Sequence, residues 1–294
     1  MLNFLLMLFS IGLATSKNIL SKLCPKGRVF SCQAVSFFTA SILALVFSIW
    51  TGLRVTPYIL LTAVAYAAFM LGAQAAYIKA VSIGDFAISS LMYSCGFVVP
   101  SLLGALIFQE PITLTQILGL IVMIISFVLA NLPRKAEKMK LRWLFWILAA
   151  MLSSGMIGLT QKLYSTLSKG ADLDSLLTVA FLIAASVSLL LGLPEQRRQA
   201  ASEPSDQTEK RGMLSLLGFM TVAALLGCVT FAYNKNNLFL SGKINSMILF
   251  PVTNGGIVVA SAFADRFLFG KKIDLRKAIA IVLGIVAIVL IVVK

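Results

Sequence analysis

The chain has 294 residues, of which 59% are hydrophobic and only 12% are charged, and this excludes an ordinary soluble domain, whose charged fraction is roughly 25%. Histidine is absent, which excludes an imidazole metal site, histidine-based catalysis and a histidine proton relay. The net charge of +14 would indicate a nucleic-acid partner in a soluble protein, but here the basic residues lie between apolar stretches, where membrane topology and lipid headgroups explain them.

Ten apolar segments, separated by charged or turn-rich gaps, follow one another along the chain. Each is close to the ~20 residues that a helix needs to cross a bilayer. The first segment lacks a basic amino-terminal region, so we expect a helix there rather than a signal peptide. The sequence therefore predicts ten transmembrane helices, at 2–20, 32–50, 57–80, 86–108, 114–132, 143–163, 173–193, 213–240, 245–269 and 275–293.

The gaps between the segments differ in charge and composition. The gap at 133–142 is a strongly basic connector, and the polar composition of 194–212 suits a flexible loop. Basic residues concentrate in the odd-numbered gaps, so the positive-inside rule places these gaps in the cytoplasm and both termini outside.

The two halves of the chain resemble each other. Ile112-Thr113-Leu114 in the first half is matched by Ile273-Asp274-Leu275 in the second, an offset of 161 positions. Because each half holds five segments, an odd number, consecutive copies must enter the membrane from opposite sides. We therefore predict an all-α integral membrane protein whose ten transmembrane helices form two inverted five-helix repeats, at 1–132 and 143–294.

The ninth segment carries polar and small residues in its middle. An unpaired amide in hydrocarbon costs several kcal/mol, by rough estimate, so an anchor helix has no use for one there. The offset of 161 pairs Asn254 with Tyr93 of the fourth segment. We predict a polar lining at mid-depth, with packing through small residues as the alternative, and structural hinges at Pro100, Pro251, Gly255 and Gly256.

Further polar side chains lie within the other segments and extend the predicted substrate-binding set. Lysines near a helix end can reach lipid headgroups at little cost, and an anion gate at each mouth of a cavity is the alternative reading of Lys17 and Lys162. Buried tyrosines normally find a partner, which is either a core residue or a ligand. The complete candidate set is Tyr93, Asn254, Thr253, Gln161, Gln74, Tyr66, Tyr77, Tyr233, Lys17 and Lys162.

The order of these features resembles a known family. Each half has a Gly/Pro-bearing fourth helix, a short hinge such as Gln109-Glu110-Pro111-Ile112-Thr113, and an apolar fifth helix with Gly119 or Gly284. This order is similar to EamA-type members of the drug/metabolite transporter superfamily. The resemblance implies cytoplasmic termini, the opposite of the charge pattern. The small multidrug resistance branch carries a glutamate in its first helix, whereas 2–16 contains no acid, which argues against carboxylate-mediated proton/drug exchange.

These features favour transport over the other function classes. We expect a secondary transporter that moves a small metabolite or drug by alternating access between two inverted repeats. The alternative is an organic-anion or sugar-phosphate-like exchanger gated by helix-end lysines. A channel is less favoured, because it needs a continuous polar pore and the polar residues here are scattered.

The sequence predicts neither an enzyme nor a bound cofactor. It has no paired mid-membrane acids, no nucleophile–base pair and no phosphate-binding G-x-x-x-x-G-K-[ST] motif, and its cysteines form no C-x-x-C pair. We expect no cofactor, no metal and no nucleic-acid partner. The expected partners are the lipid bilayer and a small-molecule substrate, and the expected form is a multi-pass protein of the bacterial plasma membrane, as a monomer or a homodimer.

Overall fold

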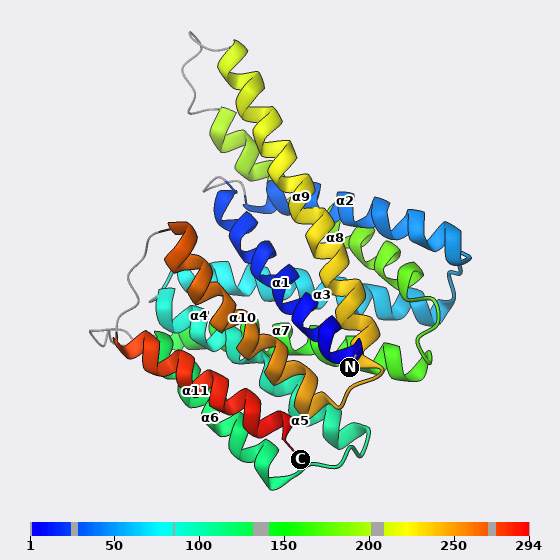
Figure 1. The fold of residues 1–294 in the computed structure, drawn as a ribbon. Helices are drawn as coiled ribbons and strands as arrows, with labels where there is room; N and C mark the ends of the chain where they lie inside the picture. The colour runs from blue at the N-terminus through cyan, green and yellow to red at the C-terminus, as the bar shows by residue number, and fades with distance from the viewer. Residues whose placement is uncertain are drawn as a thin grey trace. The chain divides into compact units, whose positions relative to one another are not determined.

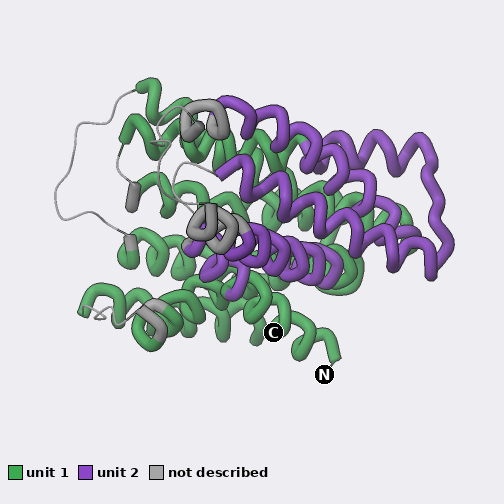
Figure 2. Tube along the Cα trace, turned by 90° about the horizontal axis from the view of Figure 1, so that it is seen from above, with its two compact units in different colours: residues 1–15, 68–171, 237–294 green, residues 16–67, 172–236 purple. Residues whose placement is uncertain are grey.

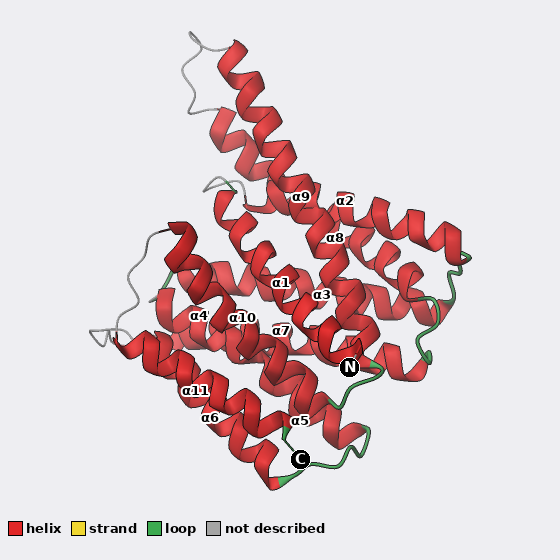
Figure 3. Ribbon diagram, viewed as in Figure 1, coloured by secondary structure: helices red, strands yellow, loops and turns green. Residues whose placement is uncertain are grey.

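A computed structural model describes residues 2–24, 29–84, 86–131, 141–200, 209–269 and 275–293. These ranges are mainly helical, with short loops between the helices, and contain no strand (Figure 3). In chain order (Figure 1) the elements are α1 (Leu2–Leu23), α2 (Val29–Thr51), α3 (Pro57–Val81), α4 (Phe86–Ser94), the 3₁₀ turn η1 (Cys95–Phe97), α5 (Val98–Ile107), α6 (Leu114–Asn131), α7 (Leu141–Leu167), α8 (Leu173–Ala200), α9 (Glu209–Ser241), α10 (Ser246–Phe269) and α11 (Leu275–Val292).

Most of the helices have the length and composition of membrane spans. Nine helical segments in the described ranges are long and apolar enough to cross a membrane, and α4, η1 and α5 jointly supply one of them. The apolar stretch of α6, Leu114–Ala130, is shorter. Large apolar side chains are exposed along the helices, including Trp50 at 90% and Leu114 at 72%. A backbone in lipid must satisfy its hydrogen bonds internally, so these features are those of an all-α, multi-pass membrane protein.

The fourth predicted span is interrupted. Its helix ends at Ser94, passes through three residues of tighter 3₁₀ geometry and resumes at Val98. Pro100 accounts for the position of the break, because it has no N–H to donate to the Gly96 carbonyl four residues earlier. Helix α10, by contrast, continues across Pro251 without a break. The proline of the fourth span therefore changes the local helix geometry, and the proline of the ninth span leaves it intact.

The described parts of the predicted loop at 194–212 are helical. Helix α8 extends to Ala200 with Pro194 inside it, and α9 already begins at Glu209. The sequence of these extensions is rich in Gln, Arg, Ala, Glu and Lys, which favour helix, so the polar composition that predicts a loop is equally compatible with solvated helix ends. Residues 201–208, and 133–140 of the predicted connector, lie outside the described ranges.

The chain divides into two compact units, coloured separately in Figure 2. Unit 1 comprises Met1–Thr15, Ala68–Ala171 and Asn237–Lys294, and unit 2 comprises Ser16–Ala67 and Asp172–Asn236. Each unit draws segments from both halves of the sequence. The predicted repeats at 1–132 and 143–294 are copies in the sequence, so the division into compact units does not test them.

Unit 1 contains an extensive antiparallel contact between α6 and α11. Gly119 lies so close to α11 that a Cβ there would come within 3.0 Å of the Ala287 carbonyl oxygen. Seven residues further along α6, the Ser126 hydroxyl donates to the Ala280 carbonyl at 2.7 Å. Small side chains let the two backbones approach, as is common between helices in lipid.

Unit 2 contains the corresponding contact between α2 and α8. The Ser41 hydroxyl donates to the Thr178 carbonyl at 3.1 Å, and the hydroxyls of Ser48 and Ser175 lie 3.0 Å apart. Position numbers rise along α2 as they fall along α8, so this pair is also antiparallel. The buried residues of α2 are mostly Ala and Ser, which allow the close packing.

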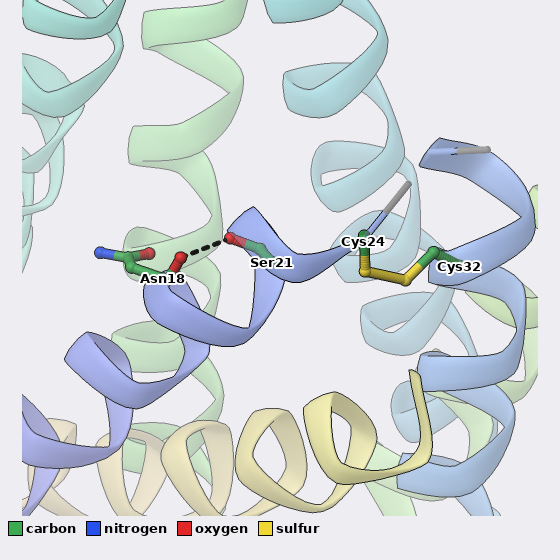
Figure 4. The surroundings of a disulfide bond; sticks show 4 residues. All are labelled: Asn18, Ser21, Cys24 and Cys32. Carbon is green, nitrogen blue, oxygen red and sulfur yellow. Dashed lines mark hydrogen bonds between the residues drawn. A yellow bond between two sulfur atoms is a disulfide. The ribbon is translucent and has the colours of Figure 1, made fainter. Parts of the chain in front are cut away.

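A disulfide joins Cys24, which follows α1, to Cys32 in the first turns of α2 (Figure 4). The Cα atoms are 6.6 Å apart, and residues 25–28, between Cys24 and the start of α2, lie outside the described ranges. A search for short-spaced cysteine motifs does not find this pair, because the two thiols are eight positions apart and meet only when the ends of α1 and α2 do.

Candidate functional site

A buried ion pair lies between Lys162 of α7 and Glu110, which follows α5. Lys162 is 4% exposed, and its Nζ lies 2.6 Å from Oε1 of Glu110. The same ammonium donates to the Ile244 carbonyl at 3.0 Å. The other carboxylate oxygen, Oε2, accepts the backbone N–H of Ser246 at 2.7 Å, at the start of α10. Lys162 therefore does not reach lipid headgroups, because its charge is neutralised inside unit 1.

The turn that ends α5 positions Glu110. Gln109 adopts a left-handed conformation with φ 51°, and the N–H of Glu110 donates back to the Ala105 carbonyl at 2.9 Å. This is the hydrogen bond of a Schellman helix end, which here uses glutamine where glycine is common. The reversed chain places the carboxylate against the positive end of the α10 dipole, which favours a negative charge.

Gln161, next to Lys162, belongs to a second buried network of unit 1. Its Oε1 accepts a hydrogen bond from Asn237 at 3.2 Å, and its backbone carbonyl accepts one from Ser241 at 3.1 Å. Gln161 is 2% exposed and Asn237 is 5% exposed. The predicted candidate Gln161 therefore ties α7 to the end of α9, and Asn237 is a partner that the predicted set does not contain.

Three predicted candidates lie on α3 and α4 in unit 1. The Tyr77 hydroxyl is 2.7 Å from the Ser90 hydroxyl, and the rings of Tyr77 and Tyr93 are 4.9 Å apart. Gln74, one turn before Tyr77, is partly exposed. The backbone carbonyl of Tyr93, just before η1, accepts a hydrogen bond from Ser154 at 3.2 Å. The structure thus brings Tyr77 and Tyr93 together next to the break in the fourth span.

The polar residues in the middle of α10 bond mainly to their own helix. The Thr253 hydroxyl donates to the Leu249 carbonyl at 2.6 Å, and the Asn254 amide donates to the Phe250 carbonyl at 2.9 Å. Thr253 is fully buried, whereas Asn254 is partly exposed. Bonds of this kind, four residues back, satisfy a polar side chain in a helix without a ligand. Of this pair, Asn254 is the residue that retains access to its surroundings.

The glycines of α10 serve close packing. A Cβ at Gly255 would meet the side chain of Met123, and one at Gly256 would meet Ile11. Both neighbours belong to unit 1. Because a side chain at either glycine would collide with them, these two predicted hinge positions fit the alternative of helix packing through small residues.

Unit 2 contains a buried tyrosine–amide pair. The Tyr66 hydroxyl donates to Oδ1 of Asn234 at 2.6 Å, and the Asn234 amide donates to the Thr230 carbonyl at 2.7 Å. Tyr66 is fully buried and Asn234 is 4% exposed. The hydrogen bond links α3 to α9, the third helix of the first half to the third of the second. The dense run of polar residues at 233–237 is the sequence signal for Asn234, although from sequence alone it is read more readily as a membrane exit.

A second ion pair lies in unit 2, between Lys235 and Asp174. The ammonium is 2.9 Å from Oδ1 and 3.1 Å from Oδ2, and it stands 3.9 Å from the centre of the Phe47 ring. Asp174 lies in the first turn of α8, where the helix dipole stabilises a carboxylate. Sequence reasoning missed Asp174, because an acid at the start of an apolar run looks like a marker of the membrane boundary.

Lys17 of α1 and Tyr233 of α9 meet in unit 2. The Lys17 ammonium lies 5.8 Å from the centre of the Tyr233 ring, close to the outer limit of ~6 Å for a cation–π contact. Both residues are half-buried. They are the two predicted candidates of this unit that the structure places side by side.

The described residues contain no group of three or more His, Cys, Asp and Glu side chains that could hold a metal ion. The partly exposed Glu110 and the buried Asp174 each bind a lysine instead. The buried polar residues thus form pairs and short networks that join helices.

Comparison with known proteins identifies a shared fold. No known protein family and no curated protein matches the sequence. The chain is similar to a solved structure described only as "Crystal structure of protein", with a TM-score of 0.74 and 15% sequence identity. The similarity covers 99% of this chain and 98% of the other. At this identity the likeness shows the fold alone, over the full length of both chains.

Proposed function

We propose that the chain is a secondary transporter, which moves a small molecule across a membrane by alternating access between two inverted five-helix repeats. The observation that carries this proposal is the set of ionised and amide side chains buried among membrane-length helices. Charged residues within a membrane protein usually pair with one another, face the protein interior or a pathway, and serve a function. Lys162 with Glu110 and Lys235 with Asp174 are such pairs, each near a helix end, and the first is the better buried, since the Lys235 side chain is 33% exposed.

Reciprocal contacts support the repeat. Adding the offset of 161 to Gly119 gives position 280, and subtracting it from Ala287 gives position 126. The close approach of Gly119 to the Ala287 carbonyl therefore corresponds to the hydrogen bond from Ser126 to Ala280. A twofold axis between two copies produces contacts of this kind, in which position i meets j and the equivalent of j meets the equivalent of i.

The directions of the helices agree with inversion. Counterpart helices of an inverted repeat run in opposite directions, and both the α2–α8 and the α6–α11 pairs are antiparallel. Counted as spans, the second (α2) packs on the seventh (α8), and the fifth (α6) packs on the tenth (α11). The third span (α3) bonds to the eighth (α9) through Tyr66 and Asn234. These pairings, together with the order of glycines and prolines in each half, support an EamA-type transporter of the drug/metabolite transporter superfamily.

Counterflow in proteoliposomes tests transport. Purified protein is assayed with radiolabelled benzoate, benzamide and benzylamine, which share a ring and differ in charge, and with a panel of amino acids. We expect at least one probe to enter faster when the vesicles are preloaded with the unlabelled compound, and to saturate, because a carrier returns more quickly when loaded. A conductance without counterflow would favour a channel, and no flux above protein-free vesicles for any probe would contradict the proposal.

The disulfide predicts the orientation of the chain. Disulfides persist in oxidising compartments, so we expect the Cys24–Cys32 end of α1 and α2 to face away from the cytoplasm. This orientation agrees with the cytoplasmic termini that the resemblance implies and opposes the one that the basic residues suggest.

The measurement is thiol labelling in intact cells of a variant with Cys95→Ala and Cys228→Ala. A membrane-impermeant maleimide should label the chain only after an impermeant reductant has been added outside. Free thiols that react only after the cells are opened would restore the orientation expected from the positive charges.

A further inference from the structure

Lys17 lies on the inward stripe of α1. The buried residues Met7, Ser10 and Ala14 recur at helical spacing along this helix, and Lys17 occupies the next position of the same stripe. Its neighbours Ser16 and Asn18 are exposed, whereas Lys17 is half-buried. Side chains of a helix tilt toward its amino terminus, so the Lys17 stem leaves the backbone away from the nearer, carboxyl end of α1. This geometry differs from that of a lysine extended to the headgroups beyond the helix end.

The ammonium of Lys17 has no counter-charge in the described part of the chain. Lys162 and Lys235 each bind a carboxylate, whereas the contact found for Lys17 is the ring of Tyr233 at 5.8 Å. A ring at that distance attracts a cation weakly and leaves the three N–H donors of the ammonium available. Neither does the Tyr233 hydroxyl hydrogen-bond to any described residue. The ammonium and the ring that carries the hydroxyl are therefore neighbours, and both polar groups have unused hydrogen-bonding capacity in the described part of the chain.

We infer that Lys17 and Tyr233 bind the single negative charge of a monocarboxylate substrate whose body is apolar. The inference rests on the proposed transport function and names its substrate class. A carboxylate has two oxygens, of which one can accept from the Lys17 ammonium and the other from the Tyr233 hydroxyl.

The number of positive charges without a carboxylate partner at this place limits the negative charge of the substrate. Lys235, two positions from Tyr233 in α9, is neutralised by Asp174 and stacked on Phe47, so it does not add a second free positive charge. A dianion such as a phosphate monoester would bring one charge more than Lys17 can balance. The surrounding spans are apolar, which favours an aromatic or aliphatic body over a sugar.

The test is ligand binding by purified protein in detergent, with three probes of one shape. Benzoate, neutral benzamide and cationic benzylamine are titrated against the thermal unfolding of wild type, Lys17→Gln, Lys17→Arg and Tyr233→Phe. Lys79→Gln is the matched control, because Lys79 also lies near the end of an apolar helix but is exposed. We expect benzoate alone of the three to stabilise the wild type and the control.

The variants should then separate binding from folding. Lys17→Gln should weaken benzoate binding by at least about tenfold, and Tyr233→Phe by about three- to tenfold, while Lys17→Arg retains part of the affinity. If Lys17→Gln does not fold, Tyr233→Phe and Lys17→Arg still give the answer. Equal stabilisation by benzoate and benzamide, no stabilisation by benzoate, or full benzoate affinity in the Lys17 and Tyr233 variants would overturn the inference.

The two proposals can fail separately. Counterflow of benzamide, benzylamine or a neutral or cationic amino acid without Lys17-dependent benzoate binding would leave the transporter in place and remove the anion site. Lys17-dependent binding of benzoate without counterflow of any probe would leave the anion site in place and remove the transporter.

Discussion

Replacing Glu110 with glutamine is expected to lower the free energy of unfolding by about 3–5 kcal/mol, which is the usual effect of removing one partner of a buried ion pair. The change leaves the Lys162 ammonium buried at 4% exposure without its carboxylate. It also weakens the acceptor of the Ser246 N–H at the start of α10. Lys162→Met should destabilise the protein for the converse reason, because it leaves the Glu110 carboxylate unpaired.

A double-mutant cycle measures this effect. Unfolding in detergent is induced by heat or denaturant and measured for each single variant and for the double variant Glu110→Gln with Lys162→Met. The double variant should be more stable than either single variant, because it removes both charges together. Lys79→Met, at an exposed lysine, is the control and should be close to wild type. Additive losses in the double variant would show that the two residues do not interact as described.

Gly155→Ala is expected to destabilise the protein by about 1–3 kcal/mol, the usual cost of overpacking. A Cβ at this position of α7 would lie 2.5 Å from both the Gly96 carbonyl oxygen and the Val99 Cβ. Gly96 belongs to η1, where the fourth span is interrupted, so a backbone atom blocks the methyl group and cannot rotate away. The same change should shift the break in this span.

Gly12→Ala is the matched control, since a Cβ at Gly12 meets no other atom within 4 Å. Alanine favours helix over glycine, so this variant should be neutral or slightly more stable than wild type. Thermal unfolding of both variants gives the comparison. If Gly155→Ala were as stable as Gly12→Ala, the close approach of α7 to the fourth span would be wrong.

The sequence predicts most of the helices, because each apolar run is limited by charges or turn residues that lipid does not tolerate. The fourth span shows the limit of this reasoning. Its proline and glycine signal an irregularity, but two spans carry such residues and only local geometry decides that α4 breaks and α10 does not. The extensions of α8 and α9 into 194–212 show that polar composition alone does not distinguish a loop from a solvated helix end.

The partners of the candidate residues could not be predicted from the sequence. Gln161 and Tyr66 are buried, and Lys162 is buried in an ion pair instead of reaching lipid headgroups. Their partners Glu110, Asn237 and Asn234 follow from how helices pack, and no spacing rule connects positions so far apart. An acid at a span end, such as Glu110 or Asp174, is ambiguous in sequence, because it marks a membrane boundary as readily as it neutralises a lysine.

Two-sided labelling of one cysteine tests the central claim, alternating access, most directly. Asn254→Cys is introduced into a variant with Cys95→Ala and Cys228→Ala, and right-side-out and inside-out vesicles are treated with a membrane-impermeant maleimide. Because a carrier opens the same site to each side in turn, we expect this partly exposed position to react from both faces. Reaction from one face only, or from neither, would contradict it.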